Sequence, residues 1–99
     1  ITQVFTPSDG ATIPMAQNGT NAWLLLKPTG ALATLNISLP SSSFAVDGQV
    51  VECSITYQVT AVAITSAGAT VKGAPTTLAA DDYFRLKYNA ESLTWYKAN

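Results

Sequence analysis

Glycine, proline and other turn-forming residues interrupt this chain at short intervals, and this spacing limits the elements between them to short ones. The runs between the interruptions are rich in Val, Ile, Thr, Leu and aromatic residues. No window keeps apolar residues at a 3.6-residue period for three turns, as an amphipathic helix would require. The sequence therefore predicts an all-β chain. The turn signals fall at residues 7–10, 14, 18–21, 28–30, 40–43, 47–48, 68, 73–75 and 89–92.

Alternation of apolar and polar residues indicates the strands and the faces that they bury. The expected strands are residues 2–6, 23–27, 34–39, 50–57, 59–65, 69–72, 76–79, 83–88 and 93–97. The apolar run 23–27 is expected to be buried on both faces. The last two strands are expected to form a hairpin, because four residues of turn character, 89–92, separate them.

In three strands the alternation is regular enough to assign an inward face. The inward residues are Leu35, Ile37 and Leu39 in the first, Val51, Cys53, Ile55 and Tyr57 in the second, and Phe84, Leu86 and Tyr88 in the third.

Eight or nine short strands in 99 residues are typical of an antiparallel β-sandwich or a jelly-roll-like fold, with a small barrel as a further option. The chain has no linker and no low-complexity segment. We therefore expect residues 1–99 to form a single β-sandwich domain.

Charge is scarce in this chain, and this excludes several classes of function. Only 11% of the residues are charged, and 5 Lys and Arg stand against 6 Asp and Glu. A protein that binds a phosphate backbone needs a surplus of Lys and Arg, so nucleic acid is not an expected partner. The chain contains no histidine, which excludes His-based catalytic triads and His-containing metal sites.

Other binding classes also lack their signatures. No apolar run approaches the length of a membrane span, and no glycine-rich phosphate loop occurs. We expect no cofactor, no metal and no membrane partner.

The acidic residues and the single cysteine favour structural roles over catalysis. Asp9, Asp47 and the pair Asp81 and Asp82 stand where turns are expected. Cys53 belongs to an apolar alternating run, which indicates a buried small side chain rather than a nucleophile. The sequence therefore predicts a protein that is not an enzyme.

The aromatic residues are the remaining candidates for binding. Trp23 and Tyr96 are candidate glycan contacts, because Trp and Tyr side chains provide stacking platforms for sugars. Trp95 is expected to fill the core, since neighbours along a strand point to opposite faces and Tyr96 then points outward.

The polar positions of the strands carry Thr, Ser, Asn and Ala rather than Lys and Glu. Such strands lack the charges that usually prevent edge-to-edge pairing. We expect part of this surface to be covered in an assembly.

Residues 22–97 resemble a module of structural proteins of tailed bacteriophages. The resemblance rests on an apolar Trp strand followed by Pro28-Thr29-Gly30, an alternating strand that ends in Leu39-Pro40, Asp47-Gly48-Gln49, a Val-Thr strand at 59–64, the segment Gly73-Ala74-Pro75-Thr76-Thr77-Leu78-Ala79, the strand Phe84-Arg85-Leu86-Lys87-Tyr88 and the ending Trp95-Tyr96. The chain departs from a tailspike in having no repetitive β-helix region and no depolymerase carboxylates.

The resemblance implies a virion surface protein, either a capsid decoration (cement) or head-fibre protein, or a module of a tail fibre or tailspike. Such modules are commonly trimeric β-sandwiches. The implied partners are copies of the chain and other virion proteins, such as the major capsid or tail proteins, after synthesis in the cytoplasm of a bacterial host.

Together these observations predict a non-enzymatic structural protein that stabilises or decorates a virion. Because aromatic and Arg side chains dominate interface energies, the expected contact residues are Tyr83, Arg85, Lys87, Tyr96 and Lys97. The alternative is a receptor- or glycan-binding module of a phage tail that uses exposed aromatic side chains.

Overall fold

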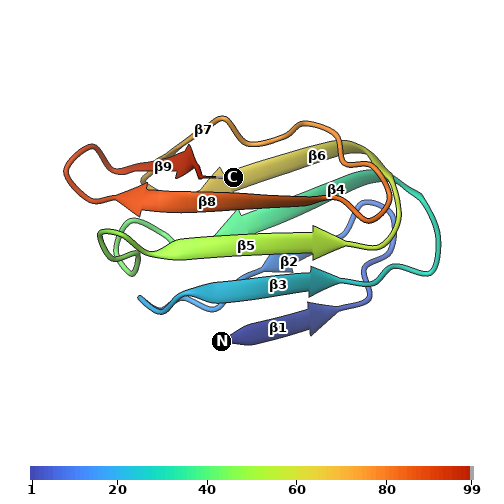
Figure 1. The fold of residues 1–99 in the computed structure, drawn as a ribbon, viewed down its shortest axis with the longest axis horizontal. Coiled ribbons are helices and arrows are strands. Elements are labelled where there is room, and N and C mark those ends of the chain that lie inside the picture. The colour runs from blue at the N-terminus through green and yellow to red at the C-terminus, as the bar shows by residue number, and fades with distance from the viewer. Residues whose placement is uncertain (99) are drawn as a thin grey trace.

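From the N-terminus to its seventh strand the chain alternates between two β-sheets, and its last three strands all belong to one of them (Figure 1). The computed structural model describes residues 1–98. The strands in this range are β1 (Thr2–Phe5), β2 (Thr12–Pro14), β3 (Ala22–Leu26), β4 (Leu32–Leu39), β5 (Val50–Ile55), β6 (Val59–Ser66), β7 (Thr70–Lys72), β8 (Tyr83–Asn89) and β9 (Thr94–Lys97). One sheet has the order β1-β3-β5-β8-β9-β7, and the other has the order β2-β4-β6. The expectation of an all-β chain is confirmed.

The first six strands form a coil that resembles a β-solenoid rather than the expected β-sandwich or jelly roll. β1, β3 and β5 pair in parallel in the six-stranded sheet. β2, β4 and β6 pair in parallel in the three-stranded sheet. Each turn of the coil thus places one strand in each sheet, and successive turns stack on one another.

The expected antiparallel pairing is wrong for most of the fold. Within residues 1–98, the pairs β1–β3, β2–β4, β3–β5, β4–β6 and β7–β9 are parallel, and only β5–β8 and β8–β9 are antiparallel. The physical reason is that the early connections cross from one sheet to the other instead of turning back beside the preceding strand. A parallel pair needs such a crossover.

The coil has no constant repeat length, which explains why no internal repeat is visible in the sequence. Paired residues are 21 positions apart between β1 and β3, as in Thr2 and Trp23, but 29 apart between β3 and β5, as in Trp23 and Glu52. In the other sheet the offset is 24 between Thr12 and Asn36, and 27 between Leu32 and Val59. Loops of different length absorb these differences.

The C-terminal strands close one side of the coil. β8 pairs with β5 and β9 pairs with β8, both antiparallel, and β7 lies outside β9 (Figure 1). The expected hairpin is confirmed, and because Asn89 pairs with Thr94, its loop is residues 90–93 rather than 89–92. Asn89 holds this loop by accepting hydrogen bonds from the backbone N–H and the hydroxyl of Ser92 at 2.9 and 2.8 Å.

A single core fills the space between the two sheets. Trp95 is fully buried in it, as expected, and its ring centroid is 5.0 Å from that of Tyr88. The Trp95 indole donates a hydrogen bond to Ser66, whose hydroxyl donates in turn to the Pro40 carbonyl, so this chain of bonds connects the sheets. The other buried apolar residues are Ile13, Met15, Leu24, Leu26, Leu32, Leu35, Ile37, Leu39, Val51, Cys53, Ile55, Val59, Val62, Leu78, Phe84, Leu86 and Tyr88.

Most of the expected strands and inward faces are confirmed, but three expectations differ from the structure. Tyr57 is exposed because β5 ends at Ile55. The run 23–27 is not buried on both faces, since Trp23 points to the solvent side of an uncovered sheet. Residues 76–79 form only an isolated bridge, between Leu78 and Val59.

Candidate functional site: the outer face of the six-stranded sheet

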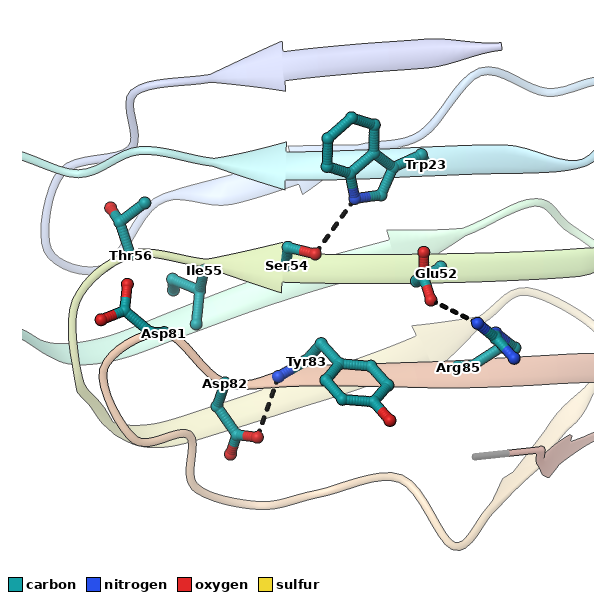
Figure 2. A pocket seen from close by; sticks show the side chains of 9 residues that line it. All are labelled: Trp23, Glu52, Ser54, Ile55, Thr56, Asp81, Asp82, Tyr83 and Arg85. Carbon is teal, nitrogen blue, oxygen red and sulfur yellow. Dashed lines mark hydrogen bonds and ion pairs between the residues drawn. The ribbon is translucent and has the colours of Figure 1, made fainter.

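Aromatic and charged side chains gather on the outer face of the six-stranded sheet. Trp23 on β3 is in register with Glu52 on β5, which is opposite Arg85 on β8. In the next row, Ser54 on β5 is opposite Tyr83 on β8. The five side chains therefore surround one small area over three adjacent strands, as Figure 2 shows.

A shallow depression of about 360 Å³ lies over this area. Trp23, Glu52, Ser54, Tyr83 and Arg85 line its floor and sides. The end of β5 and the turn before β8 close one end of it (Figure 2), and they contribute Ile55, Thr56, Asp81 and Asp82 to the lining.

Two interactions fix the side chains of this depression. The Trp23 indole N–H donates a hydrogen bond to the Ser54 hydroxyl at 3.0 Å. Arg85 and Glu52 form an ion pair at 2.7 Å, and both side chains are partly exposed. An exposed pair of this kind contributes only about 0.2–1 kcal/mol to stability. Its main effect is therefore to orient the two polar groups.

The turn that precedes β8 has the role expected from the sequence. The Asp82 carboxylate accepts hydrogen bonds from the backbone N–H of Tyr83 at 2.9 Å and of Ala79 at 3.4 Å. Asp81 has a positive φ of 61°, a backbone conformation that Asp adopts more readily than most residues. Both carboxylates border the depression, so they add negative charge to one end of it.

The structure groups the expected contact residues differently from the sequence analysis. Tyr83 and Arg85 line the depression together with Trp23. Lys87 and Tyr96 are paired with each other in a separate row, nearer β7. The fifth residue, Lys97, is exposed beside Gly73 at the end of β9. That these residues contact a partner stays a prediction.

The two candidate glycan contacts, Trp23 and Tyr96, lie on the same face but do not form one site. β5 and β8 separate their strands. The two side chains are each 41% exposed, so both are accessible to a ligand. Trp23 has Tyr83 as its aromatic neighbour across the depression instead.

Sequence reasoning missed Glu52 and Ser54 as members of this site. The alternation in β5 already placed both on the outward face. Their neighbours could not be known, because the pairing of β5 with β3 and β8 joins segments about 30 residues apart.

Cys53 lies under this face, in the core. It is buried, as expected, and burial raises the pKa of its thiol from 9.0 to about 12. At neutral pH the group is an uncharged thiol, which is a poor nucleophile. Within residues 1–98, no three side chains of the His, Cys, Asp or Glu type gather where they could hold a metal ion.

The outer face of the three-stranded sheet differs strongly from that of the six-stranded sheet. β2, β4 and β6 contain no charged residue. Their outward side chains are small or short, and none of the large exposed hydrophobic residues belongs to these strands. The outward residues are Thr12, Pro14, Thr34, Asn36, Ser38, Ala61, Ala63 and Thr65. We call this surface the uncharged face.

No known protein family, curated protein or solved structure matches this chain. In the part of the chain that the structure describes, no helix has the length and apolar character needed to cross a membrane.

Proposed function

We propose that this protein is a non-enzymatic structural module of a bacteriophage virion and that it assembles with copies of itself through the uncharged face. The observation that carries the proposal is the complete lack of charged residues in β2, β4 and β6. A parallel sheet is usually covered on both faces, and here one face of such a sheet is covered only by solvent.

Burial of this face requires little free energy. No charge has to leave water, which is the largest cost of covering a polar surface. Ala loses no side-chain entropy on burial, and Thr and Ser lose little compared with Lys or Glu. Short side chains also let a second sheet approach closely, at the spacing of about 10 Å that stacked sheets adopt.

The size of the face indicates that neighbouring loops take part. The eight residues of β4 make the face roughly 26 Å long, and its three strands make it roughly 14 Å wide. The resulting area is about half of the ~800 Å² that each partner buries in a standard interface. The loop after β4 carries two exposed apolar side chains, Phe44 and Val46, which are 50% and 52% exposed.

The resemblance of residues 22–97 to phage structural modules supports the placement on a virion. It favours a trimer, bound to capsid or tail proteins after synthesis in the bacterial cytoplasm. The proposed role is mechanical. Surface that is buried only in the assembled particle favours that particle over the free chains and so stabilises it.

Sedimentation velocity of the isolated chain and of one charged variant tests the assembly. We expect the wild-type chain to sediment as an oligomer at micromolar concentration. Ala63→Arg places an unpaired charge on the uncharged face, beside Asn36 of the central strand β4, and is expected to shift the protein to a monomer of about the 10.4 kDa chain mass. The matched control is Ala80→Arg, which adds the same charge at an exposed loop position.

If the wild type is monomeric, the assembly proposal is wrong. If both variants retain the oligomer, the assembly uses another surface. Circular dichroism of each variant separates loss of assembly from loss of folding.

A further inference from the structure

The depression at Trp23 and Tyr83 lies on β3, β5 and β8, whose sheet is separate from the three-stranded sheet that carries the uncharged face. The two sheets lie on opposite sides of the molecule (Figure 1), so assembly through the uncharged face leaves the depression open. We propose that this depression binds a neutral hexopyranose sugar, with Trp23 and Tyr83 as stacking surfaces and with Glu52, Ser54 and Arg85 as hydrogen-bonding groups.

The orientation of the two rings is the first observation. Figure 2, which looks onto the outer face, shows both rings broadside, so each presents its flat π surface to solvent rather than its edge. The bond from the Trp23 indole N–H to Ser54 holds one of them in this orientation. A pyranose ring offers C–H groups on its flat faces, and these pack against an aromatic surface.

The spacing of the rings is the second observation. Trp23 and Tyr83 are on β3 and β8, with β5 between them. Two strand spacings amount to about 10 Å. The rings are therefore too far apart to enclose one small group between them, but they suit two positions along an extended ligand.

The polar groups are the third observation. Glu52 and Arg85 hold each other at 2.7 Å, so an acceptor and a planar donor face the ligand side by side. Sugar hydroxyl groups both donate and accept, and adjacent hydroxyls match such a pair. The depression of about 360 Å³ falls in the range of small-ligand pockets.

The charges indicate that the sugar is neutral. Three carboxylates, those of Glu52, Asp81 and Asp82, border the depression, against one cation, Arg85. An excess of negative charge repels phosphate, sulfate and carboxylate groups. A quaternary ammonium ligand would suit the charge, but such a ligand is held by aromatic rings that surround it, and Trp23 and Tyr83 are two strand spacings apart.

An NMR titration of the folded chain tests the proposal. The probes are glucose, galactose, N-acetylglucosamine and their short neutral oligomers, with glucuronic acid and choline as comparison ligands. Trp23 is exposed and Trp95 is buried, so we expect their indole N–H signals to be resolved from each other. We expect at least one neutral sugar to shift the Trp23 signal with millimolar affinity, and the Trp95 signal to stay in place.

Three variants locate the site. Trp23→Ala and Tyr83→Ala each remove one stacking surface and are expected to weaken binding about tenfold. Tyr96→Ala removes an equally exposed aromatic residue outside the depression and is expected to leave the affinity within about twofold. All three side chains lie outside the core, so folding is retained.

The proposal is overturned if no neutral sugar shifts the Trp23 signal, if glucuronic acid or choline binds more tightly than every neutral sugar, or if Tyr96→Ala weakens binding as much as Trp23→Ala. Ala63→Arg distinguishes a failure of the sugar-binding proposal from a failure of the assembly proposal. This variant alters the opposite face and is expected to leave sugar binding unchanged.

Discussion

The buried side chain of Gln49 connects two loops by hydrogen bonds, and the sequence indicated only turns at these positions. It is 3% exposed, and its amide donates to the carbonyls of Asn18 and Thr20 at 3.1 and 2.8 Å. Its side-chain oxygen accepts from the backbone N–H of Val46 at 3.1 Å. Nothing in the local sequence distinguishes Gln49 from exposed Gln58, because two of its three partners, Asn18 and Thr20, lie in a loop about 30 residues away.

The buried thiol of Cys53 leads to a prediction about how the stability of the fold depends on pH. Because burial raises the pKa of its thiol to about 12, the folded chain holds the proton over a range in which the unfolded chain, with a pKa of 9.0, releases it. The stabilising effect is complete below pH 9 and is lost as the pH rises toward 12. Urea denaturation at about pH 8.5 and about pH 10.5 should therefore show a loss of about 2 kcal/mol in wild type that is absent in Cys53→Ala.

The two proteins differ only at this residue, so the difference between their pH dependences isolates the thiol. Equal pH dependence of the two proteins would contradict burial of Cys53. A thiol reagent that labels the native chain as fast as the unfolded chain would do the same.

At the scale of the element, β4 and β6 interrupt their alternation at the same place. In each strand two successive exposed residues interrupt the alternation. These are Ala33 and Thr34 in β4, and Thr60 and Ala61 in β6. The Asp9 carboxylate accepts the backbone N–H groups of Ala33 and Thr34 at 3.0 and 2.9 Å. The turn before β2 thus provides hydrogen-bond partners for β4 where its regular pairing is interrupted.

Removal of this carboxylate should destabilise the fold. Asp9→Ala leaves two strand N–H groups without their acceptor, and we expect a loss of about 1–2 kcal/mol in the free energy of unfolding. Asp9→Asn keeps one acceptor oxygen, so its loss should be clearly smaller. Thermal or urea denaturation measures both, and equal losses in the two variants would show that the charge rather than the hydrogen bonds matters.

The elements also show which features are local and which are not. The inward faces of β4 and β8 follow from alternation alone, and the hairpin of β8 and β9 follows from a short polar turn. β2 was missed, because three residues that end in Pro14 are a weak strand signal. The parallel pairing could not be predicted, since a strand that crosses to the other sheet and a strand that turns back have the same alternation.

The candidate site depends on this non-local pairing. Each of Trp23, Glu52, Ser54, Tyr83 and Arg85 is outward on its own strand, and alternation predicts this for most of them. Only the order β3-β5-β8 brings them together. An antiparallel sandwich of the same strands could place Trp23 and Tyr83 on different sheets.

At the scale of the whole molecule, the scarce charges are unevenly distributed between the two sheets. Glu52, Lys72, Arg85, Lys87 and Lys97 all belong to strands of the six-stranded sheet. The three-stranded sheet has none. We interpret this asymmetry as a division of roles, with one face for self-assembly and the opposite face for ligand binding.

Cysteine cross-linking across the uncharged face tests this account most directly, because Cys53 is buried and does not compete for the cross-link. Ala63→Cys should form a disulfide-linked dimer of twice the 10.4 kDa chain mass under mild oxidation, at micromolar protein, while Ala80→Cys should stay largely uncoupled. Ala63→Cys that remains uncoupled, and that reacts with a bulky thiol reagent as fast as Ala80→Cys, would contradict assembly through this face.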